Sequence, residues 1–139
     1  MNRLAALLAA PLAVAALLAG TPLLGAEGER VPQVGRDGPE LDACGGVARV
    51  SRVNPTGDGL LPVFPQPDDR VRPKDRLVPD TLVWLCDAQD AWQGIVYASG
   101  PFQELGDCRV SSPVAQPQAY SGPCRSGWVP AKFLFVVAD

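Results

Sequence analysis

The sequence predicts an all-β protein, a small barrel or sandwich that forms one domain. Several short segments rich in Val, Leu, Ile and Trp are separated by Gly, Pro, Asn and Asp residues, as strands and turns are. After the first 26 residues, no segment repeats its apolar residues with the period of a helix. A chain of 139 residues has room for a single domain.

Residues 1–26 have the layout of a secretory signal peptide. A positive charge near the start is followed by a run of Leu, Ala and Val over residues 4–20, and small residues then lead to a cleavage site after Ala26. The alternative is an uncleaved membrane anchor, since residues 4–26 are just long enough to cross ~30 Å of hydrocarbon. Pro11 and the many alanines make a poor permanent span. We therefore expect an exported protein, periplasmic or secreted, with no membrane span after cleavage.

The mature chain divides into a tether and a domain. Residues 27–43 are polar, charged and interrupted by prolines, which predicts a flexible tether without structure of its own. The domain spans residues 44–139. Its segment 65–80 contains four prolines and cannot be a helix, so we expect a long excursion between strands. Residues 99–125 are rich in Ser, Gly, Pro and Gln, which predicts an inserted loop.

The strands follow from alternation and from the turn signals that bound them. The first is expected over residues 47–53, and the second and third, at 81–86 and 92–98, form a hairpin around a turn at 87–90. Two more short strands follow within residues 127–137, on either side of a turn marked by Pro130.

Four cysteines in an exported chain favour two disulfides. No two of them are spaced as Cys-x-x-Cys, which argues against a thioredoxin-like redox site and against a zinc site with paired ligands. Four cysteines allow three pairings. We favour Cys108–Cys124, because it closes a local loop, together with Cys44–Cys86.

Four segments of residues 47–137 carry a family resemblance, namely GDGLLPV at 57–63, TLVWLCD at 81–87, AWQGIVY at 91–97 and SGWVPAKFL at 126–134. With these segments, residues 47–137 resemble a bacterial Src-homology-3-like (SH3-like) domain. The resemblance implies a small barrel of about five strands with a disulfide-closed insertion at about 99–125, and one turn of 3₁₀ helix after the Gly-Trp-Val strand. The cysteine-containing segments 106–108 and 122–129 are similar to those of small exported bacterial SH3-like proteins of unassigned function.

The resemblance also implies a ligand groove. Eukaryotic SH3 domains clasp proline-rich peptides between a Trp that opens the third strand and a Pro and a Tyr in the 3₁₀ turn. Trp92 and Pro130 match two of these positions, and Phe133 stands near the third without the hydroxyl. The first strand has no aromatic residue, which departs from the pattern of Pro-x-x-Pro binders. For Trp92, the alternative is a half-buried residue that closes the end of the barrel.

The other two tryptophans are expected in structural positions. Trp128 follows a glycine in a strand that crosses the barrel, so we expect it in the core. Neighbours in a strand lie on opposite faces. Either Trp84 or the pair Val83 and Leu85 must therefore face away from the main core, beneath the insertion.

Composition excludes several functions. The chain has no histidine, and so lacks the commonest general base and the commonest metal ligand. Its 12 basic against 15 acidic side chains argue against nucleic acid as a partner, because binding to phosphates needs a basic surface. Acidic residues that invite a calcium site alternate with Arg and Lys, which favours a solvated loop of mixed charge; they are Asp68, Asp69, Asp75 and Asp80. No nucleophile has a base in a recognisable arrangement. We expect no enzyme, no metal and no cofactor.

The expected function is therefore recognition. A monomeric exported module would bind a peptide or a cell-wall component such as peptidoglycan through Trp92, Pro130 and Phe133. The alternative is an inhibitor or assembly partner of another envelope protein, with the insertion at 99–125 as the contact surface. An enzyme that uses thiol chemistry would require a free cysteine.

Overall fold

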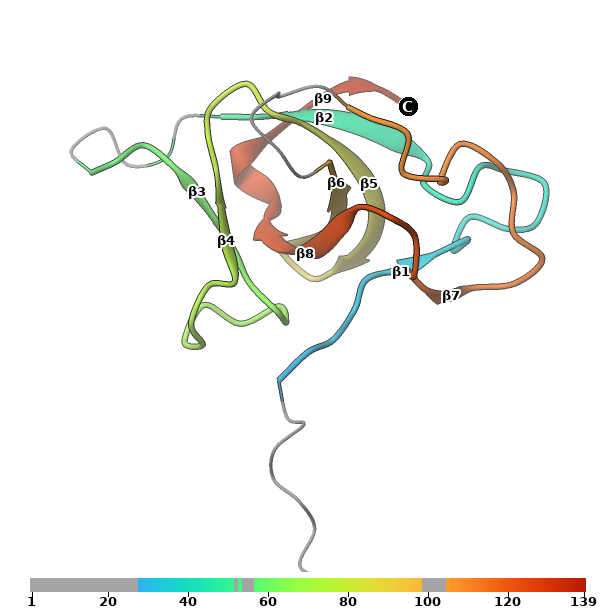
Figure 1. Ribbon diagram of the computed structural model, residues 1–139, viewed down its shortest axis with the longest axis horizontal. Coiled ribbons are helices and arrows are strands. Elements are labelled where there is room, and N and C mark those ends of the chain that lie inside the picture. The colour runs from blue at the N-terminus through green and yellow to red at the C-terminus, as the bar shows by residue number, and fades with distance from the viewer. Residues whose placement is uncertain (1–27, 52, 54–56, 99–104) are drawn as a thin grey trace, which may run out of the picture.

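The computed structural model describes residues 28–51, 53, 57–98 and 105–139, and all its elements are strands apart from one turn of 3₁₀ helix (Figure 1). The predicted signal peptide at 1–26 and the first residues of the predicted insertion, 99–104, lie outside the described residues. Within the described part of the chain the strands form one five-stranded sheet and two two-stranded sheets. The prediction of an all-β protein is confirmed.

The central element is a five-stranded antiparallel sheet with the strand order β8-β6-β5-β2-β9. Its strands are β2 (Gly46–Val50), β5 (Leu82–Gln89), β6 (Trp92–Tyr97), β8 (Arg125–Pro130) and β9 (Leu134–Ala138). The turn between β5 and β6 is shorter than expected, because β5 continues to Gln89 and only Asp90 and Ala91 connect the strands. The 3₁₀ helix Ala131–Phe133 joins β8 to β9, at the place the resemblance implies.

The long excursion after β2 is itself a hairpin. Its strands β3 (Leu61–Val63) and β4 (Asp75–Leu77) pair with each other. The hairpin meets β8 through one bridge, in which the amides of Phe64 and Trp128 each donate to the carbonyl of the other, at 2.8 and 2.9 Å. The described strands thus form three sheets in contact rather than one closed barrel.

One face of the five-stranded sheet covers the main core. The alternation of β5 places Val83 here, and the hairpin β3–β4 closes the core from the other side. The buried members are Ala48, Val50, Leu61, Val63, Leu77, Val83, Ile95, Tyr97 and Val129. Each large aliphatic side chain among them contributes roughly 1.5–3 kcal/mol by leaving water.

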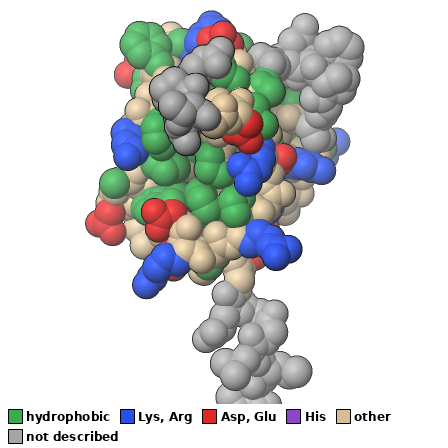
Figure 2. All heavy atoms as spheres, turned by 90° about the vertical axis from the view of Figure 1, so that its left-hand side faces the viewer, with side chains coloured by type: hydrophobic (Ala, Val, Ile, Leu, Met, Phe, Trp, Pro, Cys, Tyr) green, Lys and Arg blue, Asp and Glu red, His purple; other side chains and the backbone are tan. Residues whose placement is uncertain are grey.

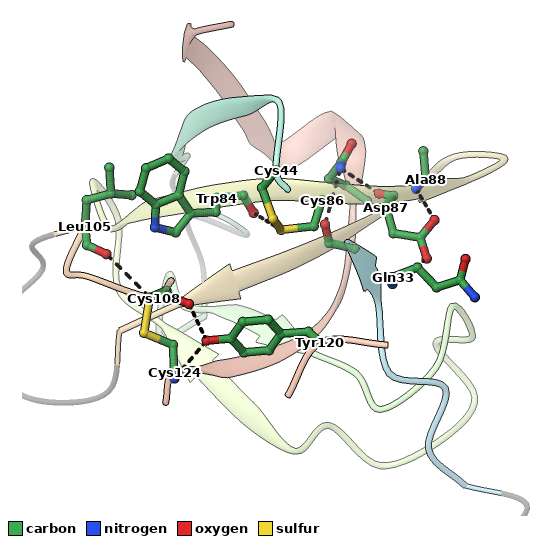
Figure 3. The surroundings of a disulfide bond; sticks show 12 residues. Gln33, Cys44, Trp84, Cys86, Asp87, Ala88, Leu105, Cys108, Tyr120 and Cys124 are labelled. Atoms are coloured by element: carbon green, nitrogen blue, oxygen red, sulfur yellow. Dashed lines mark hydrogen bonds between the residues drawn. A yellow bond between two sulfur atoms is a disulfide. The ribbon is translucent and has the colours of Figure 1, made fainter. Parts of the chain in front are cut away.

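The opposite face of the sheet carries a second, smaller core. Trp84 and Cys86 of β5 lie on this face beside the disulfides (Figure 3). Val96 of β6 packs in the same cluster, and residues that precede β2 and residues of the insertion cover it. The expected choice between Trp84 and its neighbours is thereby resolved, since Trp84 packs in the second core and Val83 in the main one. Residues that precede β2 supply Val34, Ala43 and Cys44, and the insertion supplies Cys108 and Val110.

Both disulfides belong to this second core, and they join the two pairs that we favoured, Cys44–Cys86 and Cys108–Cys124. All four cysteines are therefore bonded. The hydroxyl of Tyr120 accepts a hydrogen bond from the Cys124 amide at 3.0 Å and donates one to the Cys108 carbonyl at 2.9 Å (Figure 3). Tyr120 thus holds the two ends of the shorter disulfide loop together.

The predicted tether is wrong for residues 28–43, which we call the N-terminal segment. Its strand β1 (Gln33–Val34) pairs with β7 (Gln118–Ala119) of the insertion, at the end of the molecule opposite the β3–β4 hairpin (Figure 1). Pro32 and Val34 are buried. The polar composition suggested a free chain, but its few apolar residues and its backbone groups find partners more than fifty residues away.

Candidate functional site

The three residues predicted to bind a ligand line one hollow of about 440 Å³. Trp92 comes from the start of β6, and Pro130 and Phe133 from the two ends of the 3₁₀ turn. The opposite wall comes from the hairpin, where Pro62 and Phe64 face the hollow. We call this hollow the Trp92 groove.

Local backbone pairing holds the walls of the groove in place. Trp92 is opposite Pro130 in the β6–β8 ladder. The amide of Ala131 donates to the carbonyl of Ala91 at 2.8 Å, which ties the 3₁₀ turn to the β5–β6 turn. The two turns that flank the groove are therefore fixed relative to each other.

Phe64 is the residue of the groove that the sequence analysis missed. Its ring meets Trp92 edge to face, with centroids 5.5 Å apart and planes at 88°. Phe64 is buried and Trp92 is half-buried, so Phe64 supports Trp92 from behind while part of the indole stays accessible. Strand β2, which the sequence predicted as the first strand, lacks an aromatic residue, and the excursion after it supplies Phe64. The signal was present in the apolar run Leu61 to Phe64, which contains an aromatic residue.

The groove carries one charge of each sign at its rim. Lys132 places its ammonium 5.0 Å from the centroid of the Phe133 ring, and Asp69 lies on the hairpin side. Among the described residues neither charge forms an ion pair, whereas the neighbouring Asp68 is bound by Arg70 at 2.9 Å. The side-chain hydrogen bond from Arg70 lowers the pKa of Asp68. Seen from the side of β3 and β4, hydrophobic side chains gather between scattered charges (Figure 2).

Trp128 does not line the groove, and the prediction of a core position is confirmed. It is fully buried, and its Nε1 donates to the Arg30 carbonyl at 2.6 Å. The Arg30 guanidinium lies over the same ring at 5.2 Å. Trp128 therefore binds the N-terminal segment to the back of β8.

A buried carboxylate, Asp87, anchors the N-terminal segment at a second point. Its oxygens accept from the Gln33 amide at 2.9 Å, from the Ala88 amide at 2.8 Å and from Arg36 Nη1 at 2.6 Å. A buried carboxylate with these partners has a structural role, because both of its oxygens accept hydrogen bonds and one of them also binds a guanidinium. Asp87 was expected in the turn at 87–90, but it lies in β5, and its contacts with the N-terminal segment account for its burial.

A third polar group joins β4, β6 and β8. Tyr97 donates to Asp75 Oδ2 at 3.0 Å, and Arg125 Nη1 donates to the same oxygen at 2.9 Å. Burial, followed by the charge of Asp75, raises the pKa of Tyr97. Partial burial alone would raise the pKa of Asp75, but hydrogen bonds from the Arg76 amide, Arg125 and Tyr97 bring it below its ordinary value.

The acidic residues considered for calcium are otherwise engaged or scattered. Asp75 is held by Arg125, Asp68 by Arg70, and Asp80 lies 3.9 Å from Arg49. In the part of the chain that the structure describes, no three acidic or cysteine side chains come together as a metal site would require. The geometry there is that of a surface of mixed charge.

Two disulfides are typical of a protein that resides in an oxidising compartment. Across the described residues, no helix has the length and apolar character that crossing a membrane requires. Comparison with protein-family models, with curated proteins and with solved structures found no match to this chain.

Proposed function

We propose that this protein is an exported, non-enzymatic binding module with an SH3-like domain, which recognises a peptide or a cell-wall component through the Trp92 groove. The observation that carries the proposal is the convergence of Trp92, Pro130 and Phe133 on one apolar hollow. These residues were singled out from the sequence alone, and they lie in different elements. Export places the module in the periplasm or outside the cell.

The order of elements supports the SH3-like resemblance. Strand β2 is followed by a long excursion that contains β3 and β4, and then by the β5–β6 hairpin. The insertion, the Gly-Trp-Val strand β8 and one turn of 3₁₀ helix come next. The excursion returns beside the 3₁₀ turn, so that both contribute to the groove. The resemblance implies this succession, although the hydrogen bonding of the sheets stops short of a closed barrel.

The walls of the groove favour a ligand with a flat or extended apolar surface. An accessible indole supported edge-on by a second ring can stack on a proline, an aliphatic side chain or a sugar face. The rim charges of Lys132 and Asp69 then orient polar groups at either side. Nothing in the groove supplies a nucleophile with its base, so recognition is the chemistry that the residues fit.

Sedimentation with insoluble peptidoglycan tests the cell-wall form of the proposal. We expect the wild type to pellet and Trp92→Ala to lose roughly tenfold or more in affinity, as removal of a central aromatic anchor does. Phe135→Ala is the matched control, because it removes an exposed aromatic ring that lies outside the groove. Equal partition of the wild type and Trp92→Ala into the supernatant would exclude the cell wall.

Titration with extended proline-containing peptides, followed by tryptophan emission, then tests the peptide form.

The insertion supports a second candidate, an inhibitor or assembly partner of another envelope protein. Residues 115–119 are all exposed, yet the β1–β7 pairing and the Cys108–Cys124 disulfide hold the chain around them. A rigid, exposed loop is a common form of protein contact. A partner that binds wild type and Trp92→Ala equally well would favour this candidate over the groove.

A further inference from the structure

The chain between β3 and β4, residues 64–74, supplies one wall of the Trp92 groove, and we call it the hairpin tip. Phe64 and Asp69 of the tip line the groove. The strands of the hairpin are fixed by their residues in the main core. At Phe64 the chain crosses β8 so closely that a Cβ added to Gly127 would lie 2.9 Å from the Phe64 carbonyl oxygen. The tip therefore begins at a crossing that packing fixes.

Beyond this crossing, the hairpin tip borders a second hollow of about 240 Å³. This hollow is lined by residues of the tip, of β5 and of the N-terminal segment, namely Gln66, Pro67, Asp68, Gln89 and Arg30. Among the described residues, none lines both this hollow and the Trp92 groove. The tip therefore has room to shift away from the groove unless another part of the chain holds it.

Arg30 of the N-terminal segment holds the tip at this point. Its amide donates to the Pro65 carbonyl at 2.9 Å, one residue beyond the crossing. Its own carbonyl accepts from Trp128 Nε1 at 2.6 Å, and its guanidinium lies over the same ring, 5.2 Å from the centroid. An exposed ion pair between Glu29 and Lys74 adds a weaker link. Because Trp128 is fully buried, it is a fixed support to which Arg30 binds the tip.

We propose that Arg30 is a positioning residue of the Trp92 groove, which sets the separation of Phe64 from Trp92. The inference rests on the proposed function, because it concerns the same groove. Arg30 is not among the described residues that line the groove. It acts through Pro65 and the adjacent Phe64, whose ring meets Trp92 edge to face with centroids 5.5 Å apart. Residues that act through others in this way change affinity by roughly 2-fold to 30-fold.

Fluorine NMR of the protein labelled with 5-fluorotryptophan tests the positioning without a ligand. The chain has three tryptophans, and replacing each in turn by Phe assigns its resonance. In Arg30→Ala we expect the Trp92 resonance to shift or broaden, while the Trp84 resonance stays in place because Trp84 lies in the second core. Arg30→Pro should shift the Trp92 resonance further, because proline has no amide to donate to Pro65. Arg30→Lys should leave it close to the wild type, since an ammonium can also lie over an indole.

Binding measurements then test the consequence for the groove, with insoluble peptidoglycan and the extended proline-containing peptides as probes. For a probe that the wild type binds, we expect Arg30→Ala to lose about fivefold in affinity, less than Trp92→Ala. Because Arg30 acts through Phe64, this loss should disappear when Phe64→Ala is already present. Arg72→Ala is the matched control, since it removes an exposed positive charge from the tip itself and should change neither binding nor the Trp92 resonance.

Two results would overturn the inference. The Trp92 resonance could be the same in Arg30→Ala and Arg30→Pro as in the wild type, which would show that the tip keeps its position without Arg30. The loss of affinity could be as large with Phe64→Ala present as without it, which would show that Arg30 does not act through Phe64. Failure of the wild type to bind either probe would contradict the proposed function instead, and the fluorine spectra would still decide whether Arg30 positions the tip.

Discussion

Phe64 illustrates how a single residue can complete a site that the sequence shows only in part. Trp92, Pro130 and Phe133 were recognisable from their neighbours, but the aromatic partner of Trp92 comes from the excursion after β2. The bridge between Phe64 and Trp128 holds that excursion against β8. The same bridge therefore serves both the main core and the groove.

Tyr97 gives a prediction for alkaline pH. Its folded-state pKa is raised above the value of about 10 that tyrosine has in an unfolded chain. The stability it contributes is therefore complete below pH 10 and is lost as the pH rises above 10, because the unfolded chain then releases the proton first. We expect the free energy of unfolding, measured with urea, to fall above pH 10 in the wild type. Tyr97→Phe should flatten this fall.

The control for this prediction is the comparison of the two proteins at pH 7. There Tyr97→Phe removes one hydrogen bond to Asp75, which Arg125 still binds, and should cost about 1 kcal/mol. An alkaline slope of the same steepness in both proteins would contradict the assignment to Tyr97.

At the scale of elements, the N-terminal segment is the largest difference from what the sequence suggested. It is bound to the sheet through Asp87, to Trp128 through the Arg30 carbonyl, and to the insertion through β1 and β7. Close packing accompanies these bonds. A Cβ added to Gly94 would lie 2.9 Å from Pro32 Cβ and 2.7 Å from Asp87 Cβ, so β6 needs a glycine where the segment crosses it. The segment is thus a structural part of the domain.

Hydrogen exchange distinguishes a bound segment from a tether. The amides of Gln33, Gly35 and Tyr120 donate to Asp87, Ala43 and Pro32 respectively, and should exchange slowly. Asp87→Ala leaves the Gln33 amide without its acceptor and Arg36 without its counter-ion. We expect a loss of about 3 kcal/mol of stability and faster exchange across residues 30–43, measured by mass spectrometry.

Asp42→Ala is the matched control, because Asp42 is an exposed carboxylate of the same segment. It should leave both stability and exchange unchanged. Fast exchange of residues 30–43 in the wild type would instead support the flexible tether that the sequence predicted.

At the scale of the whole molecule, two cores share one sheet. The main core holds the aliphatic residues, and the second core is small and contains both disulfides. A domain of about 100 residues buries a modest share of its surface on folding. The covalent links on one face therefore add to what the apolar core supplies on the other.

The disulfides should contribute unequally, because the loops that they close differ in length. Cys44 and Cys86 are separated by 42 residues, and Cys108 and Cys124 by 16. In the chain-entropy model the longer loop is worth about 4 kcal/mol and the shorter about 3. We therefore expect the urea midpoint to fall further for the double variant Cys44→Ala/Cys86→Ala than for Cys108→Ala/Cys124→Ala. A loss below about 1 kcal/mol for the first pair would contradict the model.

The sequence by itself determined the local features of this protein. Alternation and turn residues are local properties, and they predicted the all-β class, the strands around Trp84 and Trp92 and the turn at Pro130. Cysteine count and composition favoured disulfides and recognition over catalysis. Trp92 could be proposed as a ligand contact because its immediate neighbours carry the resemblance.

The tertiary structure decided which distant segments meet. The polar composition of the N-terminal segment predicted a flexible tether. Its partners Asp87 and Ala119 lie more than fifty residues away, so local sequence does not reveal them. The role of Phe64 depends on where the excursion returns, and that of Arg30 on its bonds to Pro65 and Trp128. A periodic pattern specifies which side chains share a face of a strand. It does not specify what covers that face, because this depends on the packing of the whole chain.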